Sequence, residues 1–339
     1  MKIAVVGVTG VVGETILRVL DERAVAVDEL GAFASRDREE PLVWRDRSWP
    51  IRKATSEALA SGAFDAVFFA SSDDASADLA QHAVQAGAVV IDNSSTFRLA
   101  EGVPLVVPEV NPDHAGASDA IFPVANCTAI VLCVGIAPIA RGPGLRSVRV
   151  ATYQAVSGAG KAGLEALAEE ERAEFTLEQS SVVSPFAAEI FRNVIPLVGS
   201  SFDENGDSGE EKKLAAETRK ILALANLHVA ATTVRVPVRY AHSEAVFLET
   251  ERDTSVAEIA ALLEAAPGVV YHRDGIVTPR DVEGQDLVHV ARLRAEGDSK
   301  RHFQLWVVGD QVRKGAATNA VQILELLIER GRFAAAVNA

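Results

Sequence analysis

Cysteine is scarce in this chain of 339 residues, which has only Cys127 and Cys133. The two lie in one apolar stretch that we expect to be helical, six residues and therefore about 9 Å apart along the axis, too far for a disulfide. A disulfide framework is thereby excluded, and nothing in the sequence indicates an oxidising compartment. We expect a cytoplasmic protein.

Positive charge is also in short supply. The chain has 33 Lys and Arg against 47 Asp and Glu, which gives a formal net charge of -14 at pH 7. The overall field therefore repels nucleic acid and anionic membranes, and we expect neither as a partner. An anionic ligand needs a local group of basic residues.

Long uninterrupted apolar runs are missing as well. The most apolar interval, 120–141, is interrupted by Pro123, Asn126 and Pro138, so it predicts a buried core helix and not a membrane span. The start, MKIAVVGVTG, leads into a glycine turn and not into the cleavage site of a signal peptide. With 48% hydrophobic and 24% charged residues, the composition is that of a folded chain with room for two domains.

The first part of the chain alternates strands with helices. Strands are expected at 2–6, 29–35, 66–70 and 88–91, with helices at 14–21 and 75–86. This alternation predicts right-handed βαβ units and a parallel sheet, in which ligands bind beyond the carboxyl ends of the strands. Ser71, the segment 92–95 and then Arg98 fall at such ends.

The turn at 7–13, GVTGVVG, joins the first strand to the first helix. Glycines there let the backbone approach a pyrophosphate that rests on the helix N-terminus, so the position predicts a dinucleotide site. A tight turn without a ligand is the alternative. The candidate cofactor-binding residues of this turn are Gly7, Thr9, Gly10, Val11, Val12 and Gly13.

The end of the second strand indicates which dinucleotide binds. NAD-specific proteins place an acidic residue there, whereas this chain has Ser35-Arg36-Asp37-Arg38. A serine with arginines fits a 2′-phosphate, so we favour NADP over NAD. Solvated loop charges are the alternative for the arginines, and Asp37 weighs against a phosphate.

Cys127 stands where a strand ends and a helix begins, in FPVANCTAIVLCVGIAPIA at 122–140. The first turn of a helix has unpaired N–H groups and the positive end of the dipole, and both favour a thiolate. This stretch alone leaves two hypotheses open for Cys127, a reactive nucleophile and a buried structural thiol.

The pattern changes after this helix. Strands are expected at 146–156, 229–238, 244–249, 287–294 and 302–308, with one clear helix, 254–265, among the later ones. Such a run indicates a mixed or antiparallel sheet covered on one face. The apolar helix at 315–328 is expected to pack on the first domain, with Asn319 facing the nucleotide.

The predicted fold class is α/β, with a Rossmann-type parallel-sheet domain followed by an α+β domain that has a mixed sheet. The expected boundaries are 1–125 for NADP binding and 126–318 for the second domain. The segment 319–339 is expected to return to the NADP-binding domain.

Segments along the whole chain resemble the aspartate-β-semialdehyde dehydrogenase family. They are GVTGVVG, DNSSTFR, VVPEVN, ANCT, YQAVSGAGKAG, EEKKLAAETRKIL, RVPVRYAHSEAV and VVGDQVRKGAATNAVQI. Two places depart from the family's pattern. This chain has VANCT where the family usually has ANPNCS or ANPNCT. It has Ser71-Ser72-Asp73-Asp74 where the family tends to have a glycine-rich turn.

The resemblance implies reductive dephosphorylation of L-aspartyl 4-phosphate by NADPH, which gives L-aspartate 4-semialdehyde and inorganic phosphate through a cysteine thioester. It places the enzyme in lysine, threonine and methionine biosynthesis, with no metal, as a homodimer or a tetramer. The alternatives are an N-acetyl-γ-glutamyl-phosphate reductase, whose substrate lacks a free ammonium, and a non-catalytic paralogue.

The resemblance also implies roles for single residues. Cys127 is the nucleophile, His242 the group that accepts and donates a proton, and Gln154 orients the acyl intermediate. Arg235 holds the substrate carboxylate bidentately, and Glu210 receives the substrate ammonium.

Lys213, Arg98 and Asn126 are expected at the phosphate, and a loop with Ser157, Gly158 and Gly160 at the nicotinamide. Further cofactor contacts are expected from Ser35, Arg36, Ser71 and Asn319. Taken without the resemblance, Glu210 and Lys213 also fit an exposed ion pair, with a register uncertain by one residue. His242 likewise fits a structural turn residue, and Arg98 a surface arginine.

Overall fold

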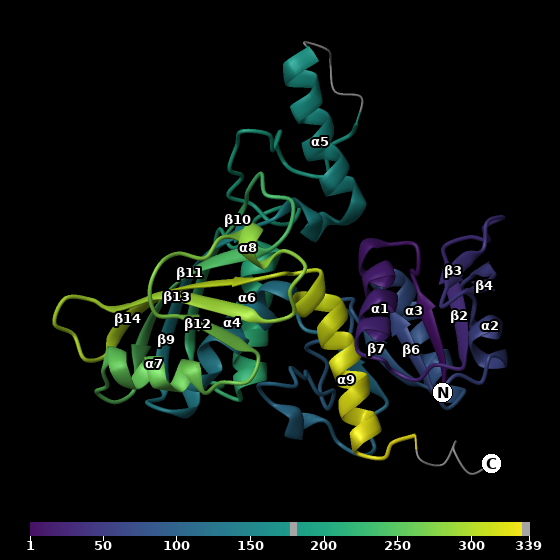
Figure 1. The fold of residues 1–339 in the computed structure, drawn as a ribbon, viewed down its shortest axis with the longest axis horizontal. Helices are drawn as coiled ribbons and strands as arrows, with labels where there is room; N and C mark the ends of the chain where they lie inside the picture. The colour runs from purple at the N-terminus through teal and green to yellow at the C-terminus, as the bar shows by residue number, and fades with distance from the viewer. Residues whose placement is uncertain (177–181, 334–339) are drawn as a thin grey trace. The chain divides into compact units, whose positions relative to one another are not determined.

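The computed structural model describes residues 1–176 and 182–333 and divides into two compact units. Unit 1 comprises Met1–Ala125 and the chain from Ala316 onward, and unit 2 comprises Asn126–Gly315. Each unit has its own sheet (Figure 1). In the described part of the chain, no helix is long and apolar enough to span a membrane.

Unit 1 contains a six-stranded sheet in the order β5-β2-β1-β6-β7-β8, and every pair in it is parallel. The parallel Rossmann-type sheet predicted from the alternating pattern is therefore confirmed. The strands are β1 Lys2–Val6, β2 Glu29–Ala34, β5 Ile51–Lys53, β6 Ala66–Phe69, β7 Val89–Asp92 and β8 Ile121–Pro123.

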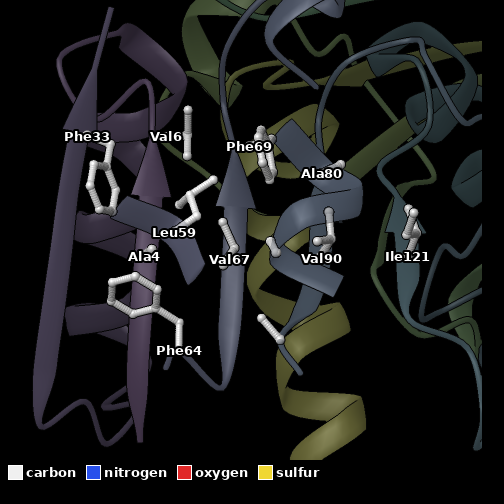
Figure 2. Close-up of a cluster of buried hydrophobic side chains, with 12 residues drawn as sticks. Ala4, Val6, Phe33, Leu59, Phe64, Val67, Phe69, Ala80, Val90 and Ile121 are labelled. Carbon is white, nitrogen blue, oxygen red and sulfur yellow. The ribbon is translucent and has the colours of Figure 1, made fainter. Parts of the chain in front are cut away.

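Helices cover both faces of this sheet. On one face, α2 (Ser56–Ser61) and α3 (Asp73–Gln85) enclose a core to which each neighbouring strand contributes a side chain. Figure 2 shows Phe33, Val67 and Val90 projecting from β2, β6 and β7 in this core. Elsewhere in unit 1, α9 (Thr318–Glu329) packs against α1 (Val11–Glu22) and β7.

A small hairpin of β3 (Leu42–Trp44) and β4 (Arg47–Trp49) has no counterpart in the predicted strands. Its turn residues Arg45 and Asp46 both have positive φ, 50° and 55°, a conformation that turn sequences usually mark with Asn-Gly. The Trp44 indole N–H donates to an Asp21 carboxylate oxygen at 2.8 Å. The hairpin thus depends on a contact with α1 that the local sequence does not reveal.

Unit 2 contains a mixed sheet in the order β10-β9-β11-β14-β13-β12. The pairs β10-β9 and β12-β13 are parallel and the others are antiparallel, which confirms the mixed sheet that the sequence predicts. The strands are β9 Leu145–Gln154, β10 His228–Arg235, β11 His242–Thr250, β12 Val269–His272, β13 Val288–Ala295 and β14 His302–Gly309.

Three helices of unit 2, α4 (Cys127–Arg141), α6 (Gly209–Leu222) and α7 (Val256–Glu264), pack against this sheet. From Thr128 to Ile139 every residue of α4 is buried, as expected for a helix that is apolar all round. The helix α5 (Gly160–Thr176) projects away from the sheet (Figure 1), and α8 (Pro279–Val282) packs near β14. This arrangement brings the first turn of α4 to the ends of β9, β10 and the start of β11.

Candidate active site

The N-terminus of α4 is fixed by Asn126. Its side-chain oxygen accepts hydrogen bonds from the N–H groups of Thr128 at 3.0 Å and Ala129 at 3.3 Å, as a helix cap does. Its own N–H donates to Glu217 Oε2 at 2.5 Å. Cys127 is therefore the first residue of the helix, where the unpaired N–H groups and the dipole favour a thiolate.

His242, the first residue of β11, approaches the nucleophile. Its Nε2 lies 3.5 Å from Cys127 Sγ, and its Nδ1 accepts the N–H of Ala155 at 3.0 Å. Since Nδ1 is occupied as an acceptor, the neutral ring carries its proton on Nε2 and presents it to the sulfur. Burial lowers the pKa of His242 well below its usual value, and the positive charge of Arg235 adds to this. His242 is thus a neutral hydrogen-bond donor to Cys127.

Arg235, at the end of β10, supplies positive charge beside this pair. It is almost fully buried, and its Nη1 donates to Ala155 O at 2.7 Å. Burial lowers its pKa, whereas the negative charges of Cys127 and Glu210 oppose that shift. Its Nε has no hydrogen-bond partner among the described residues, so this donor is available to an anionic ligand.

Gly158 leaves room for the Arg235 guanidinium. A Cβ atom on Gly158 would lie 2.8 Å from Arg235 Nη1 and 3.4 Å from His242 Cε1. The 3-10 turn Val156–Ala159 therefore passes close to both side chains, and a larger residue at 158 would displace the Arg235 guanidinium. The hydroxyl of the neighbouring Ser157 is engaged inside unit 2, where it donates to Arg239 O and accepts from the side chain of Gln311. Gly160, at φ 70°, ends the turn.

Glu210, in the first turn of α6, accepts hydrogen bonds near Cys127 through one carboxylate oxygen. Its Oε1 accepts from Asn126 Nδ2 at 3.0 Å, from Gln154 Nε2 at 3.1 Å and from the Thr128 hydroxyl at 3.4 Å. Gln154 is itself buried and accepts from Thr152 at 3.1 Å. The carboxylate therefore holds two amide side chains that flank Cys127.

The neighbours of Glu210 have different partners, which distinguishes the register. Glu211 forms a capping box with Ser208 and accepts the N–H of Thr233 at 2.8 Å, and Lys212 pairs with Asp203 at 2.9 Å. Glu210, Lys212 and Lys213 all line a cavity of about 300 Å³ beside the loop 198–203, and Lys212 is the one that pairs with Asp203. Lys213 thus stands beside Glu210 with its ammonium available to a ligand of that cavity.

The glycine turn of unit 1 has a close-packed backbone. Gly7 has φ 90°, and a Cβ atom there would lie 2.2 Å from Ala70 O. A Cβ atom on Gly13 would lie 2.3 Å from Gly7 O. Gly10 is the N-cap of α1 and has no side chain to cap the helix, and Val11 and Val12 begin it. A backbone cradle at an uncapped helix N-terminus suits a pyrophosphate.

The positions expected at the adenosine ribose are open to solvent. Ser35 and Arg36 are exposed directly after β2, whereas the Asp37 carboxylate accepts the N–H of Lys53 at 2.7 Å. That bond ties Asp37 to Lys53, the last residue of β5, while Arg36 has no such contact to hold it among the described residues. The Ser71 hydroxyl, after β6, is buried without a partner among the described residues.

Two expected site residues belong to unit 1. Arg98 is buried, and its Nη2 donates to Asn93 O at 2.8 Å. Asn319 is buried near the start of α9, and its Nδ2 donates to Val106 O at 3.1 Å. The residues that the structure brings together around Cys127 are His242, Gln154, Asn126, Glu210, Arg235 and Gly158.

Sequence reasoning missed residues that shape the nucleophile's surroundings. Thr128 and Glu217 hold Glu210 and Asn126 in place. Gly315 lies in a π-helical turn, Arg313–Ala317, and a Cβ atom there would lie only 2.9 Å from Cys127 Cβ. In the sequence, this close approach is indicated only by a glycine followed by small residues. That pattern does not show that the neighbour is Cys127.

Glu244 was also missed, and it gives a pH prediction. It lies two residues after His242 on the same face of β11, is fully buried, and neither carboxyl oxygen has a partner among the described residues. Burial raises its pKa well above the usual value, so it is a neutral acid in the fold. The stability linked to this group is complete below the unfolded pKa and is lost as pH rises through the folded pKa.

We therefore expect Glu244→Gln to unfold at a higher temperature than the wild type above the unfolded pKa of the carboxyl, with a difference that grows as pH rises. Thermal unfolding from pH 4 to pH 9 measures it, with Glu249→Gln, on the same strand and ion-paired with Arg146, as the matched control. Parallel curves for wild type and Glu244→Gln would contradict the prediction.

Comparison with known proteins gives the same family in both halves of the chain. The model of the semialdehyde dehydrogenase NAD-binding domain matches residues 2–118, and that of the semialdehyde dehydrogenase dimerisation domain matches residues 136–314. Aspartate-semialdehyde dehydrogenase of Aquifex aeolicus is 39% identical over 337 residues, which covers 97% of this chain and 98% of the relative. Aspartate-semialdehyde dehydrogenase 2 of Vibrio cholerae is 40% identical over 331 residues, covering 96% and 97%.

Solved structures agree. Aspartate-semialdehyde dehydrogenase II of Vibrio cholerae, complexed with ASA, has a TM-score of 0.91 and 38% identity and covers 97% of this chain and 98% of its own. The Candida albicans enzyme with NADP shares the fold at a TM-score of 0.74 and 23% identity, with coverage of 98% and 99%. On this similarity along its whole length, the chain belongs to the aspartate-semialdehyde dehydrogenase family.

Proposed function

We propose that this chain reduces L-aspartyl 4-phosphate to L-aspartate 4-semialdehyde and inorganic phosphate with NADPH, through a thioester on Cys127. The observation that carries the proposal is the position of Cys127 Sγ at the start of α4, 3.5 Å from the Nε2 of a buried, neutral His242. A thiolate placed there attacks the acyl phosphate carbonyl and expels phosphate. Bound NADPH supplies the hydride that reduces the resulting thioester.

His242 acts in this proposal as the donor. Its Nε2–H hydrogen-bonds the thiolate before attack and the negatively charged oxygen that develops on the substrate afterwards, and Nδ1 stays on Ala155 N–H throughout. The unpaired N–H groups at the start of α4 add to the stabilisation of the same negative charge. Proton acceptance by His242, which the resemblance implies, requires Nδ1 to release the Ala155 N–H.

Substrate recognition is assigned to charged groups around Cys127. Arg235 offers its free Nε to the substrate carboxylate, and Glu210 exchanges its amide partners Asn126 and Gln154 for the substrate ammonium. An N-acetylated substrate has no ammonium for Glu210, so a glutamyl-phosphate reductase activity is not favoured. Lys213, Arg98 and Asn126 are the proposed phosphate ligands.

The cofactor is proposed to be NADP, bound in unit 1. The glycines let the turn 7–13 pack closely before the N-terminus of α1, which has no side-chain cap and suits a pyrophosphate, and Ser35 and Arg36 are exposed for a 2′-phosphate. Gly10, Thr9, Val11 and Val12 complete the pyrophosphate turn, and Ser35, Ser71 and Asn319 are further proposed contacts. Unit 1 is thus the proposed NADP-binding part, and unit 2 carries catalysis. A cytoplasmic location remains part of the proposal.

A homodimer is proposed through the outer face of the unit 2 sheet. The family model that matches unit 2 describes a dimerisation domain. The outward side chains of β9, β11 and β14 include Tyr153 and Phe247, 39% and 40% exposed, with Tyr153 packed on Trp306 at 5.4 Å between rings. Aromatic side chains beside polar ones such as Arg149, which pairs with Phe247 across the sheet, are typical of an interface between copies of a chain. Analytical ultracentrifugation at micromolar concentration checks it, and a purely monomeric protein would contradict it.

The reverse reaction tests the proposed function. We expect reduction of NADP by L-aspartate 4-semialdehyde that requires inorganic phosphate, with NADP preferred over NAD by kcat/KM. The parallel assay with N-acetyl-glutamate semialdehyde should give little or no turnover. Absence of phosphate-dependent reduction with either aldehyde would favour the non-catalytic paralogue, and preference for the acetylated aldehyde would favour the reductase.

A further inference from the structure

The turn after β6 has the sequence Ser71-Ser72-Asp73-Asp74. The two acidic residues begin α3, whose N-cap is Ser72. Asp73 and Asp74 are both exposed, but their contacts differ. The Asp73 carboxylate accepts the N–H of Ser95 at 2.8 Å through one oxygen and the hydroxyl of Ser95 at 2.6 Å through the other.

The loop that Asp73 holds is the one that carries Arg98. The Thr96 hydroxyl donates to Asp73 O at 3.1 Å, so the carboxylate and the backbone of Asp73 bind two successive loop residues. Ser95 O in turn accepts the N–H of Arg98 at 3.4 Å. Asp73 therefore holds Ser95, and Ser95 in turn holds the backbone of Arg98.

Other contacts fix the beginning of this loop, and two of them reach further: the Ser94 hydroxyl accepts the N–H of Thr96 at 3.2 Å, and Phe97 packs on the core of unit 1. Asn93 Nδ2 donates to Phe69 O at 3.2 Å, and the Asp92 carboxylate accepts the N–H of Ser94 at 2.9 Å and its hydroxyl at 2.6 Å. These bonds tie the loop to β6 and β7. Asp73 ties the following residues, Ser95 and Thr96, to α3, and a carboxylate at a helix N-terminus is itself favoured by the dipole.

We infer that Asp73 is a positioning residue for phosphate, which holds the loop 93–98 so that the Arg98 guanidinium is preorganised for the phosphate ligand. The Arg98 side chain folds back on the same loop, with Nη2 on Asn93 O at 2.8 Å, so its orientation depends on the loop's conformation. Preorganisation lowers the cost of ordering the loop when phosphate binds. The inference rests on the proposed function, because it takes Arg98 as a phosphate ligand.

The test compares Asp73→Ala, Asp73→Asn and Asp74→Ala in the reverse assay. Asp73→Ala removes both acceptors, so we expect the KM for phosphate to rise about tenfold, with kcat and the KM for aspartate semialdehyde within about twofold. Asp73→Asn keeps an acceptor for Ser95 N–H and can donate to the Ser95 hydroxyl, so it should restore a near wild-type KM. Asp74→Ala removes the same charge from the neighbouring position and should leave the KM for phosphate unchanged.

Hydrogen exchange of the loop separates this inference from the proposed function. Amides in 93–98 should exchange faster in Asp73→Ala than in Asp74→Ala, whether or not the enzyme turns over. Unchanged exchange would overturn the role of Asp73, as would faster exchange with an unchanged KM for phosphate. A wild type with no phosphate-dependent activity would overturn the proposed function, and with it this role, even where the exchange is faster.

Discussion

Cys127→Ala should lose phosphate-dependent reduction of NADP by a factor of at least about a thousand, because no other side chain can form the thioester. The thiol is at the first turn of α4, and the Nε2–H of His242 and the charge of Arg235 stabilise its ionised form. Alkylation by iodoacetamide should inactivate the wild type in parallel, with one carbamidomethyl group found on Cys127. Full activity of Cys127→Ala would end the covalent mechanism.

The matched control is the second cysteine of the same helix. Cys133 is fully buried, and burial raises the pKa of its thiol far above the usual range, so it remains protonated and unreactive. Cys133→Ala should therefore keep kcat within about threefold and lose only stability, by about 1 kcal/mol for a small side chain in the core. Loss of activity in both variants would point to the integrity of α4 and not to a nucleophile.

Arg235→Lys should reduce kcat/KM for aspartate semialdehyde about 100-fold, although the positive charge is kept. The guanidinium uses Nη1 to hold Ala155 O at 2.7 Å and still has Nε for the substrate. A single ammonium cannot make both bonds in the same geometry, so the substrate loses an oriented carboxylate contact. Steady-state kinetics with varied aldehyde at saturating phosphate and NADP measures the effect.

Arg239→Lys is the control for that substitution. Arg239 lies four residues further on, and its side chain is exposed, so this variant should retain kcat/KM within about twofold. The KM for phosphate should change little in either variant, because phosphate is assigned to other residues. An Arg235→Lys enzyme with wild-type kcat/KM would show that the carboxylate binds elsewhere.

Sequence patterns predicted the features that depend on neighbouring residues. The start of α4 near Cys127 follows from the change from a strand-like apolar run to helical spacing, and the parallel sheet of unit 1 follows from alternating strands and helices. The edge strand β12 was missed because its residues are all half-buried and show no alternation. Local periodicity is informative only where one face of an element is clearly buried.

Contacts between segments far apart in the chain could not be predicted from the sequence patterns. Which of two adjacent glutamates faces the nucleophile depends on where α6 begins, and Ser208 sets that by bonding Glu211, which leaves Glu210 for Asn126. The low pKa of His242 depends on burial by the whole of unit 2. The resemblance named Glu210 and His242, but only the packed structure shows which atom of each is free to act.

A residue with no side chain, Gly315, packs against the nucleophile. At Gly315 even one added methyl group would lie 2.9 Å from Cys127 Cβ and 3.2 Å from its Cα, atoms that the helix start holds in place. As long as the backbone of this turn keeps its path, no other amino acid fits at position 315 without displacing Cys127 or the turn. A variant with a larger substrate pocket must therefore gain the volume by shortening other side chains, because Gly315 has no side chain to shorten.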